Sequence, residues 1–337
     1  MYDLILYIPT YNRLERLRMA IGCIAADIAA TRDGAARVHV VVSNNGSPDG
    51  TRAFLDALEY PWLTVLHNAE NRGFFLNAIR AYDLPVSGRF VWAIGDDDYL
   101  VPGALEHLLG IIAADPALEF IFCNTAAFEV PPESQAAIHA QIRQTGLLPE
   151  GGKGKCKLAG PDGPLPYGQL VRPDIADTLM GELMVNCFAQ ARFRLPYAEA
   201  EAINARIEAE FAAGDPSLET EGLRHQPHNY ALLRAADGQM PAYLSRRILT
   251  YNFWGTVEWL NDYDYIFPVI VLYLITEYRA RAILPPDLYR PVVDWYFRGM
   301  GASLLKQVNG TSTAKPIGNA IKAELFALLL RFVSETL

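Results

Sequence analysis

The feature that most constrains the fold of this chain is the alternation of short apolar runs with helical stripes along its first 125 residues. Leu14, Leu17 and Ile21 begin a stripe with three- and four-residue spacing, and a second stripe follows Pro102, as expected of helices that pack on a sheet. The apolar runs between them are predicted to be buried strands, at Asp3–Ile8, Val38–Ser43, Leu63–His67, Phe90–Ile94 and Glu119–Asn124. Strands that alternate with helices predict an α/β fold, with a doubly wound, mostly parallel sheet and helices on both faces.

After residue 125 the pattern changes twice. Residues 131–173 are rich in glycine and proline and are predicted to be a long loop, of the kind that forms lids and binding loops. A strand over Leu183–Ala189 and a helix over Tyr197–Phe211 are expected next, and three further helices at 255–282, 286–307 and 316–335. The chain is therefore predicted to have three parts, at 1–125, at 126–250 and in a C-terminal helical subdomain at 251–337.

Charge and cysteine content argue against several classes of protein. The chain carries 29 basic and 38 acidic side chains, a net charge of −9, without a basic block, so a nucleic-acid partner is not expected. The four cysteines are scattered, which argues against a disulfide framework or a zinc site and favours a reducing cytoplasm. No secretory signal is predicted, and the longest apolar run, Ile266–Ile275, is about half of a bilayer span. We expect a cytoplasmic protein without a transmembrane span, with peripheral contact at the inner face of the membrane left open.

Three successive carboxylates, Asp96, Asp97 and Asp98, follow the fourth predicted strand directly after Gly95. Like charges at this spacing raise one another's pKa unless a cation or hydrogen-bond donors compensate them. A divalent ion shared with substrate phosphates would be such a cation, whereas a solvated turn that caps the next helix is the plainer alternative. Because one aspartate would suffice for a cap, the triplet favours a metal–phosphate site.

Polar loops follow the first three predicted strands as well. They read IPTYNR from Ile8, VVSNNGSPDGT from Val41 and NAENRGFF from Asn68. Turns and helix caps would explain each of them alone, but ligands of doubly wound sheets bind outside the carboxyl ends of the strands. The loops therefore predict a nucleotide crevice, in which Arg72 supplies a cation near a diphosphate.

Four segments in this order, IPTYNR, VVSNNGSPDGT, NAENRGFFLNAIRA and GDDDYLVPGAL, resemble family 2 glycosyltransferases of GT-A fold. The resemblance covers roughly residues 3–125, and the GDDD form is similar to the branch that builds bacterial surface polysaccharides. It implies a metal-dependent, inverting transfer of a sugar from a nucleotide-diphosphate donor, with Mn²⁺ or Mg²⁺. The acceptor expected is the hydroxyl of a glycan or of a lipid-linked molecule.

Roles carried over by this resemblance concern the donor first. Thr10, Tyr11 and Arg13 match the loop that lines the nucleotide. Asn44 and Asn45 stand where family members usually have aspartates, Asn45 at the position that reads the base. Because a carboxamide can both donate and accept, cytosine or a purine becomes more admissible here, and uracil stays a candidate.

The acidic triplet matches the D-x-D signature of the family only in part. Asp96 corresponds to the ribose contact and Asp97 to the metal ligand, whereas Gly95 replaces the signature's first aspartate. Asp98 is expected to order the loop or to help hold the metal through water.

The general base is expected from residues 215–230, because it must lie across the anomeric carbon from the leaving diphosphate. Glu221 is the predicted base and Glu219 its substitute, since both would face one side of an extended segment. His228 is the predicted metal or phosphate ligand. The alternative is a solvated acidic loop with a core histidine.

Other functions receive less support. A dinucleotide dehydrogenase lacks its G-x-G-x-x-G after the first strand, and a sugar nucleotidyltransferase lacks its basic glycine-rich loop. A non-catalytic nucleotide-sugar-binding protein or scaffold with a decayed site stays an alternative, because Asn44, Asn45 and Gly95 depart from the family. Aromatic residues after Tyr251 favour a buried helical core or a subunit interface over a lipid contact, which leaves open a homo-oligomer through the C-terminal helices.

Overall fold

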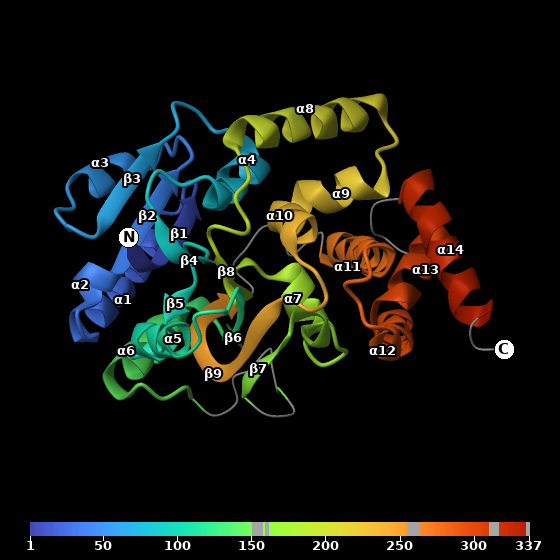
Figure 1. Ribbon diagram of the computed structural model, residues 1–337. Helices are drawn as coiled ribbons and strands as arrows, with labels where there is room; N and C mark the ends of the chain where they lie inside the picture. The colour runs from blue at the N-terminus through green and yellow to red at the C-terminus, as the bar shows by residue number, and fades with distance from the viewer. Residues whose placement is uncertain (150–157, 159–161, 255–262, 310–316, 335–337) are drawn as a thin grey trace.

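The computed structural model describes residues 1–149, 158, 162–254, 263–309 and 317–334 (Figure 1). Figure 1 shows a sheet and its covering helices in one half of the molecule and a group of helices at the other end. None of the helices in these ranges is long and apolar enough to cross a membrane.

The described residues form a nine-stranded sheet in the order β3-β2-β1-β4-β8-β6-β9-β5, with β7 paired to β9. Strands β1 to β4 are parallel neighbours, and β8 is antiparallel to both β4 and β6. The strands are β1 Tyr2–Thr10, β2 Val38–Asn44, β3 Leu63–His67, β4 Gly88–Ala93, β5 Tyr99–Leu100, β6 Phe120–Glu129, β7 Gly163–Pro166, β8 Asn186–Ala189 and β9 Pro241–Trp254. All of β2 is buried, as is usual for a parallel strand with both faces covered.

Helices cover this sheet and build the other end of the molecule. In Figure 1, α1, α2, α5 and α6 lie on one side of the strands and α4 and α8 on the other. The helices are α1 Leu14–Ala30, α2 Gly34–Arg37, α3 Thr51–Asp56, α4 Gly73–Ile79, α5 Ala104–Ala114, α6 Pro132–Thr145, α7 Ala176–Gly181, α8 Tyr197–Ala213, α9 Leu218–His225, α10 Pro227–Ala235, α11 Tyr263–Ala280, α12 Pro286–Tyr296, α13 Ala302–Val308 and α14 Asn319–Ser334. The predicted α/β fold with C-terminal helices is confirmed.

The long loop predicted at 131–173 is wrong over its first part, which is the helix α6. Pro132 occupies the first turn, good helix formers follow, and Gly146 ends the helix with a φ of 67°. The glycines and prolines farther along the chain misled the prediction. Residues 163–166 form β7, and the Gly151–Lys155 run lies outside the described residues.

Two other boundaries differ from the prediction. The strand expected over Leu183–Ala189 begins only at Asn186, after a single 3₁₀ turn at 183–185. Strand β9 was not predicted, and it continues to Trp254, past residue 251, where the C-terminal helical subdomain was expected to begin. It pairs in parallel with β6, with a register shift between Cys123 and Thr125. The division of the chain at 125 and 250 stays a prediction.

Candidate active site

The loops after β1, β2, β3 and β4 meet at one edge of the sheet, because parallel strands end on the same side. Backbone hydrogen bonds tie neighbouring loops together. The Asn45 N–H donates to the Thr10 carbonyl at 3.0 Å, and the Asn68 N–H donates to the Asn44 carbonyl at 2.9 Å. The first three predicted loops therefore lie side by side.

Asp96 joins the β4 loop to the β1 loop. Its carboxylate accepts from the Thr10 hydroxyl at 2.7 Å and from the Arg13 guanidinium at 3.2 Å. Asp96 is buried, so both contacts lie largely out of water. Three residues that the sequence singled out, Thr10, Arg13 and Asp96, thus form one network.

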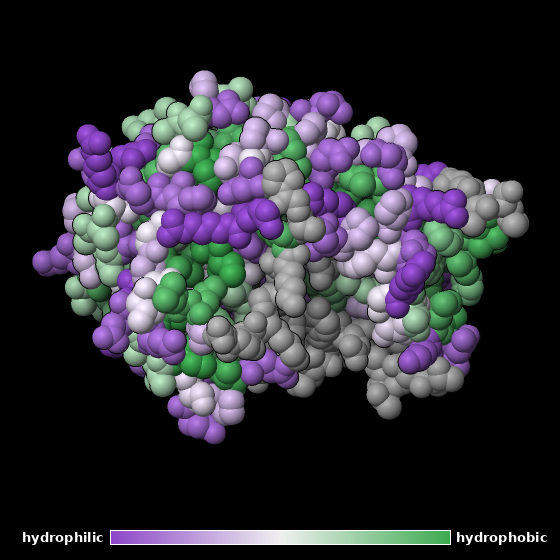
Figure 2. All heavy atoms as spheres, turned by 90° about the horizontal axis from the view of Figure 1, so that it is seen from below, coloured by the Kyte–Doolittle hydropathy of each residue, from purple (hydrophilic) through white to green (hydrophobic). Residues whose placement is uncertain are grey.

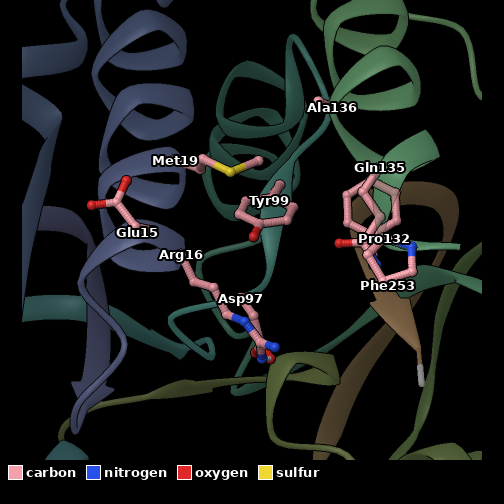
Figure 3. Close-up of a pocket in the computed structure, with 9 residues that line it drawn as sticks. All are labelled: Glu15, Arg16, Met19, Asp97, Tyr99, Pro132, Gln135, Ala136 and Phe253. Carbon is pink, nitrogen blue, oxygen red and sulfur yellow. Dashed lines mark hydrogen bonds and ion pairs between the residues drawn. The ribbon is translucent and has the colours of Figure 1, made fainter. Parts of the chain in front are cut away.

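Asp97 is the member of the triplet that faces a cavity. Its Oδ2 lies 3.2 Å from Arg13 Nη1 and 3.1 Å from Arg16 Nη1, both at the start of α1. Its side chain is 25% exposed and borders a cavity of about 220 Å³ (Figure 3). Figure 3 shows Asp97 and Arg16 meeting at one end of this cavity, with α1 on one side and α6 on the other. The lining residues are Glu15, Arg16, Met19, Asp97, Tyr99, Pro132, Gln135, Ala136 and Phe253.

Asp98 closes the turn that carries the triplet. One oxygen accepts from the Gly95 N–H at 2.7 Å, and the other accepts from the Asn252 amide on β9 at 2.9 Å. A Cβ on Gly95 would come within 2.9 Å of Asp97 Oδ1 and of Asp98 Oδ2. A side chain at position 95 would therefore require the carboxylates of Asp97 and Asp98 to shift.

Burial is the main cause of raised pKa values at this site. It raises the pKa of Asp96 to about 6 and that of Asp98 to about 7, and the neighbouring charge of Asp97 adds to both shifts. Arg13 and Thr10 oppose the shift at Asp96, and Asn252 and the Gly95 N–H oppose it at Asp98. Each of these two carboxyls can therefore hold a proton near neutral pH.

Replacing Asp98 by asparagine should stabilise the protein more at pH 8 than at pH 5. The folded pKa of about 7 exceeds the ordinary value of 3.8, so the natural protein loses stability progressively as the pH rises between these two values, and the loss is complete above pH 7. An asparagine amide could donate to Asn252 Oδ1, the side-chain amide oxygen, which has no hydrogen-bond partner among the described residues. Thermal unfolding at both pH values checks this, and equal melting temperatures at pH 8 would contradict it.

Asn45 is buried and uses its whole side-chain amide inside the protein. The amide nitrogen donates to Asn71 Oδ1 at 2.8 Å and to the Gly73 carbonyl at 3.1 Å. The amide oxygen accepts from Asn68 Nδ2 at 2.8 Å and from the Arg72 N–H at 2.9 Å. Asn45 therefore holds the loop after β3 in place, and its reading of a base stays a prediction.

Three other residues expected at the donor lie on the same loops. The Asn44 amide is 3.1 Å from His67 Nδ1, and its oxygen accepts from the Ser47 N–H at 3.1 Å. Tyr11 is exposed. Arg72 forms an ion pair with Glu201 on α8 at 2.9 Å, so it would have to leave this partner to reach a diphosphate.

Glu219 and Glu221 do not lie on an extended segment, as the sequence analysis assumed, but on the helix α9. The Ser217 hydroxyl caps this helix by accepting from the Thr220 N–H. Residues two apart on a helix point in different directions. Glu219 faces outward and pairs with Arg206 at 2.9 Å, whereas Glu221 is buried.

Glu221 lies on α9 and His228 lies on α10. Glu221 is 3.6 Å from His225 and accepts a hydrogen bond from Tyr265. His228 is fully buried, which lowers its pKa to about 3, and neither ring nitrogen has a hydrogen-bond partner among the described residues. Within those residues, no three histidine, cysteine or acidic side chains are grouped to hold a metal. His228 has the surroundings of a core histidine, and its role as a ligand stays a prediction.

Glu182 is a carboxylate that the sequence analysis overlooked. It follows α7 directly, is half-buried, and its charge contributes to the raised pKa of Asp98 after burial and Asp97. Strand β8 is antiparallel to β4, with Cys187 opposite Trp92, so β8 starts where β4 ends. A prediction that β8 runs antiparallel would have placed Glu182 at the same edge of the sheet as the triplet.

Residues 5–158 match the sequence model of glycosyl transferase family 2. These residues form a family 2 glycosyltransferase domain. The protein is therefore a glycosyltransferase, and its fold is of GT-A type. The matched range contains most of β1, all of β2 to β6, and the four motif loops. No curated protein matches the chain.

Solved structures share the fold of this glycosyltransferase at low sequence identity. TarS of S. aureus (residues 1–349) in complex with UDP-GlcNAc is 13% identical, with a TM-score of 0.57 over 98% of this chain and 81% of that one. Its complex with UDP gives 12% identity and a TM-score of 0.54 over 98% and 80%. The mannosyltransferase PcManGT from Pyrobaculum calidifontis, in complex with GDP-Man and Mn²⁺, is 14% identical over 100% of this chain and 84% of that one, with a TM-score of 0.49.

Proposed function

We propose that this glycosyltransferase moves a sugar, with inversion and with the help of a divalent ion, from a nucleotide-diphosphate donor to a hydroxyl of a glycan or lipid-linked acceptor. The observation that carries the proposal is the state of the acidic triplet. Asp96 and Asp98 are buried and use both oxygens inside the protein. Asp97 pairs with Arg13 and Arg16 through Oδ2 and borders a cavity beyond the end of β4.

Asp97 fits a metal that is held mainly by the substrate. Mg²⁺ commonly binds one or two carboxylates together with substrate phosphates and water, so a single carboxylate beside a cavity is sufficient. Asp98 would support it by ordering the turn, through the hydrogen bonds to Gly95 and Asn252. When bound, a divalent ion supplies positive charge that stabilises the leaving diphosphate.

The remaining residues of the crevice would bind the nucleotide. Asp96 lies between Thr10 and Arg13, where a carboxyl of raised pKa can donate to, or accept from, a ribose hydroxyl. Arg13 and Arg16 hold positive charge next to Asp97, within reach of a diphosphate bound there. Tyr11 is exposed at the same loop and offers a ring for the base.

The general base must remove a proton from the acceptor hydroxyl on the side opposite the leaving group. Glu182 is the leading candidate, because it is a half-buried carboxylate within electrostatic range of the triplet and on the neighbouring strand connection. Glu221, the base predicted from the sequence, remains the alternative candidate, and Glu219 is its exposed substitute.

Donor binding measured by thermal shift tests the proposal. The panel holds UDP-GlcNAc, GDP-, CDP- and dTDP-sugars, each with and without Mn²⁺, and a ligand at 100 times its Kd stabilises the fold by about 2.7 kcal/mol. We expect one nucleotide to give the largest shift and Mn²⁺ to increase it. Asn45→Ala is the matched variant: a base preference that persists in it would remove Asn45 as the reader. A panel without any shift would contradict the proposed donor class.

A further inference from the structure

The cavity beside Asp97 contains two polar groups that have no hydrogen-bond partner within the described residues. One is the hydroxyl of Tyr99, a residue that is only 3% exposed. Figure 3 shows this hydroxyl pointing towards Arg16 and Asp97. The other is the amide nitrogen of Gln135 in the first turn of α6, which is itself buried. Because buried polar groups are nearly always hydrogen-bonded, these two are placed to bond to water or to a ligand in the cavity.

The other walls of the cavity are mainly apolar. Met19 of α1, Pro132 of α6 and Phe253 of β9 border it. The Tyr99 ring packs against Phe253 and Tyr251, with ring centroids 6.0 and 5.5 Å apart, so its hydroxyl is held in place. The volume of about 220 Å³ is below the ~300–1,000 Å³ of sites for drug-sized ligands, so the cavity suits a single ring rather than a whole nucleotide.

This mixture of groups suits a sugar. A sugar ring carries hydroxyl groups around its edge and C–H groups on its faces, so it can bond to Tyr99 and Gln135 while it packs against the apolar walls. A lipid chain would leave both polar groups without a partner, at a cost in binding. In Figure 1 α6 lies at the lower edge of the molecule, and Figure 2 shows hydrophilic and hydrophobic residues mixed over the face seen from below. The cavity therefore suits a sugar better than a lipid.

We propose that the cavity holds the sugar of the donor, and that Tyr99 and Gln135 select this sugar by hydrogen bonds to its hydroxyl groups. The inference rests on the proposed function, in which the diphosphate is bound at Asp97. A single oxygen joins the diphosphate to the anomeric carbon, so the sugar must lie next to the diphosphate, and Asp97 borders the cavity. Glu182, the leading candidate for the base, does not line the cavity, so the acceptor hydroxyl is expected outside it.

The charges at the cavity favour a neutral sugar. Glu15 and Asp97 both border it, and Arg16, the one cation among the described lining residues, already pairs with Asp97 at 3.1 Å. A sugar with a carboxylate of its own would meet these two acidic side chains, and like charges placed together weaken binding. We therefore expect the donor to carry an uncharged sugar rather than a uronic acid.

Calorimetric titration with two ligands tests the proposal. They are the sugar nucleotide that gives the largest shift in the thermal-shift panel and the same nucleoside diphosphate without its sugar. Tyr99→Phe removes the hydroxyl and keeps the ring, and Gln135→Ala removes the amide. Each should weaken binding of the sugar nucleotide about three- to tenfold, the usual worth of one hydrogen bond, and leave binding of the bare diphosphate unchanged. Ala136→Phe, which adds a ring at the cavity wall, should weaken binding of the sugar nucleotide alone by at least about tenfold.

Two matched variants and one further ligand complete the test. Tyr251→Phe removes a neighbouring hydroxyl that bonds to His139 at 2.9 Å and does not line the cavity. Ala137→Phe adds the same ring at the next exposed position of α6, which does not line the cavity either. Both variants should keep the natural affinity for both ligands. In the natural protein, the glucuronic acid conjugate of the nucleotide should bind at least about tenfold more weakly than the glucose conjugate.

Unchanged affinity of Tyr99→Phe and Gln135→Ala for the sugar nucleotide would overturn the proposal, and so would an equal loss for the bare diphosphate. A raised KM for the acceptor with unchanged donor affinity would assign the cavity to the acceptor and overturn it too. Equal or tighter binding of the glucuronic acid conjugate would overturn the choice of a neutral sugar. The proposed function fails differently, because the natural protein would then bind neither ligand, and the inference would fall with it.

Discussion

Replacing Asp97 by asparagine should abolish Mn²⁺-dependent donor binding and leave the fold intact. Asparagine has the same shape, but it lacks the negative charge that would bind a cation between protein and diphosphate. Arg13 and Arg16, which lie 3.2 and 3.1 Å from the carboxylate, also lose the negative charge with which they pair. Removing one charge-stabilising group from an active site typically costs about 10²–10³ in turnover, and we expect a loss of at least this size.

Calorimetric titration of the donor, with and without Mn²⁺, measures this effect separately from turnover. Glu15→Gln is the matched control, because Glu15 borders the same cavity but lies on α1, with its carboxylate near Arg18. It should keep the response to Mn²⁺. If Asp97→Asn binds donor as tightly as the natural protein and responds equally to Mn²⁺, the metal assignment is wrong.

The second large effect concerns the base. Glu182→Gln should lower turnover about 10²–10⁴-fold, the usual loss when general-base help is removed, while donor affinity stays close to its natural value. The amide cannot take a proton from the acceptor, yet it keeps the size and hydrogen-bonding shape of the side chain. Glu182 lies within electrostatic range of Asp98, at the start of the connection to β8, and this is the reason for the expectation.

Three glutamine variants, measured in parallel with the same acceptor, separate the candidates. Glu221→Gln should mainly lower stability if its hydrogen bond with Tyr265 inside the helical part is structural, and Glu219→Gln should change little because its side chain is exposed. Loss of turnover in Glu221→Gln with normal turnover in Glu182→Gln would return the role to the residue predicted from sequence. Normal turnover in all three would place the base elsewhere.

Some differences between prediction and structure arose because local signals in the sequence were overlooked. Ser217 precedes two glutamates and is followed by Arg224 and His225, which is the pattern of a capped helix with favourable charges at both ends. That pattern predicts α9 and excludes an extended arrangement of Glu219 and Glu221. Pro132 before a run of helix formers indicates α6 in the same way. In these two segments, the nearby glycine, proline and acidic residues led instead to the prediction of a loop and of an extended chain.

The sequence by itself determined the α/β fold and the first half of the site. Each of the residues Thr10, Arg13, Asp96 and Asp97 lies within a few positions of a strand end, and parallel strands bring their ends to one edge without further information. Only the tertiary structure decided the second half. Strand β8 enters the sheet antiparallel between β4 and β6, which brings Glu182 within electrostatic range of Asp98. Strand β9 brings the Asn252 amide into a hydrogen bond with Asp98 across 154 positions of the chain. Such contacts depend on strand direction and on long-range packing. Neither of these leaves a periodic or local signal in the residues, so the sequence alone does not predict them.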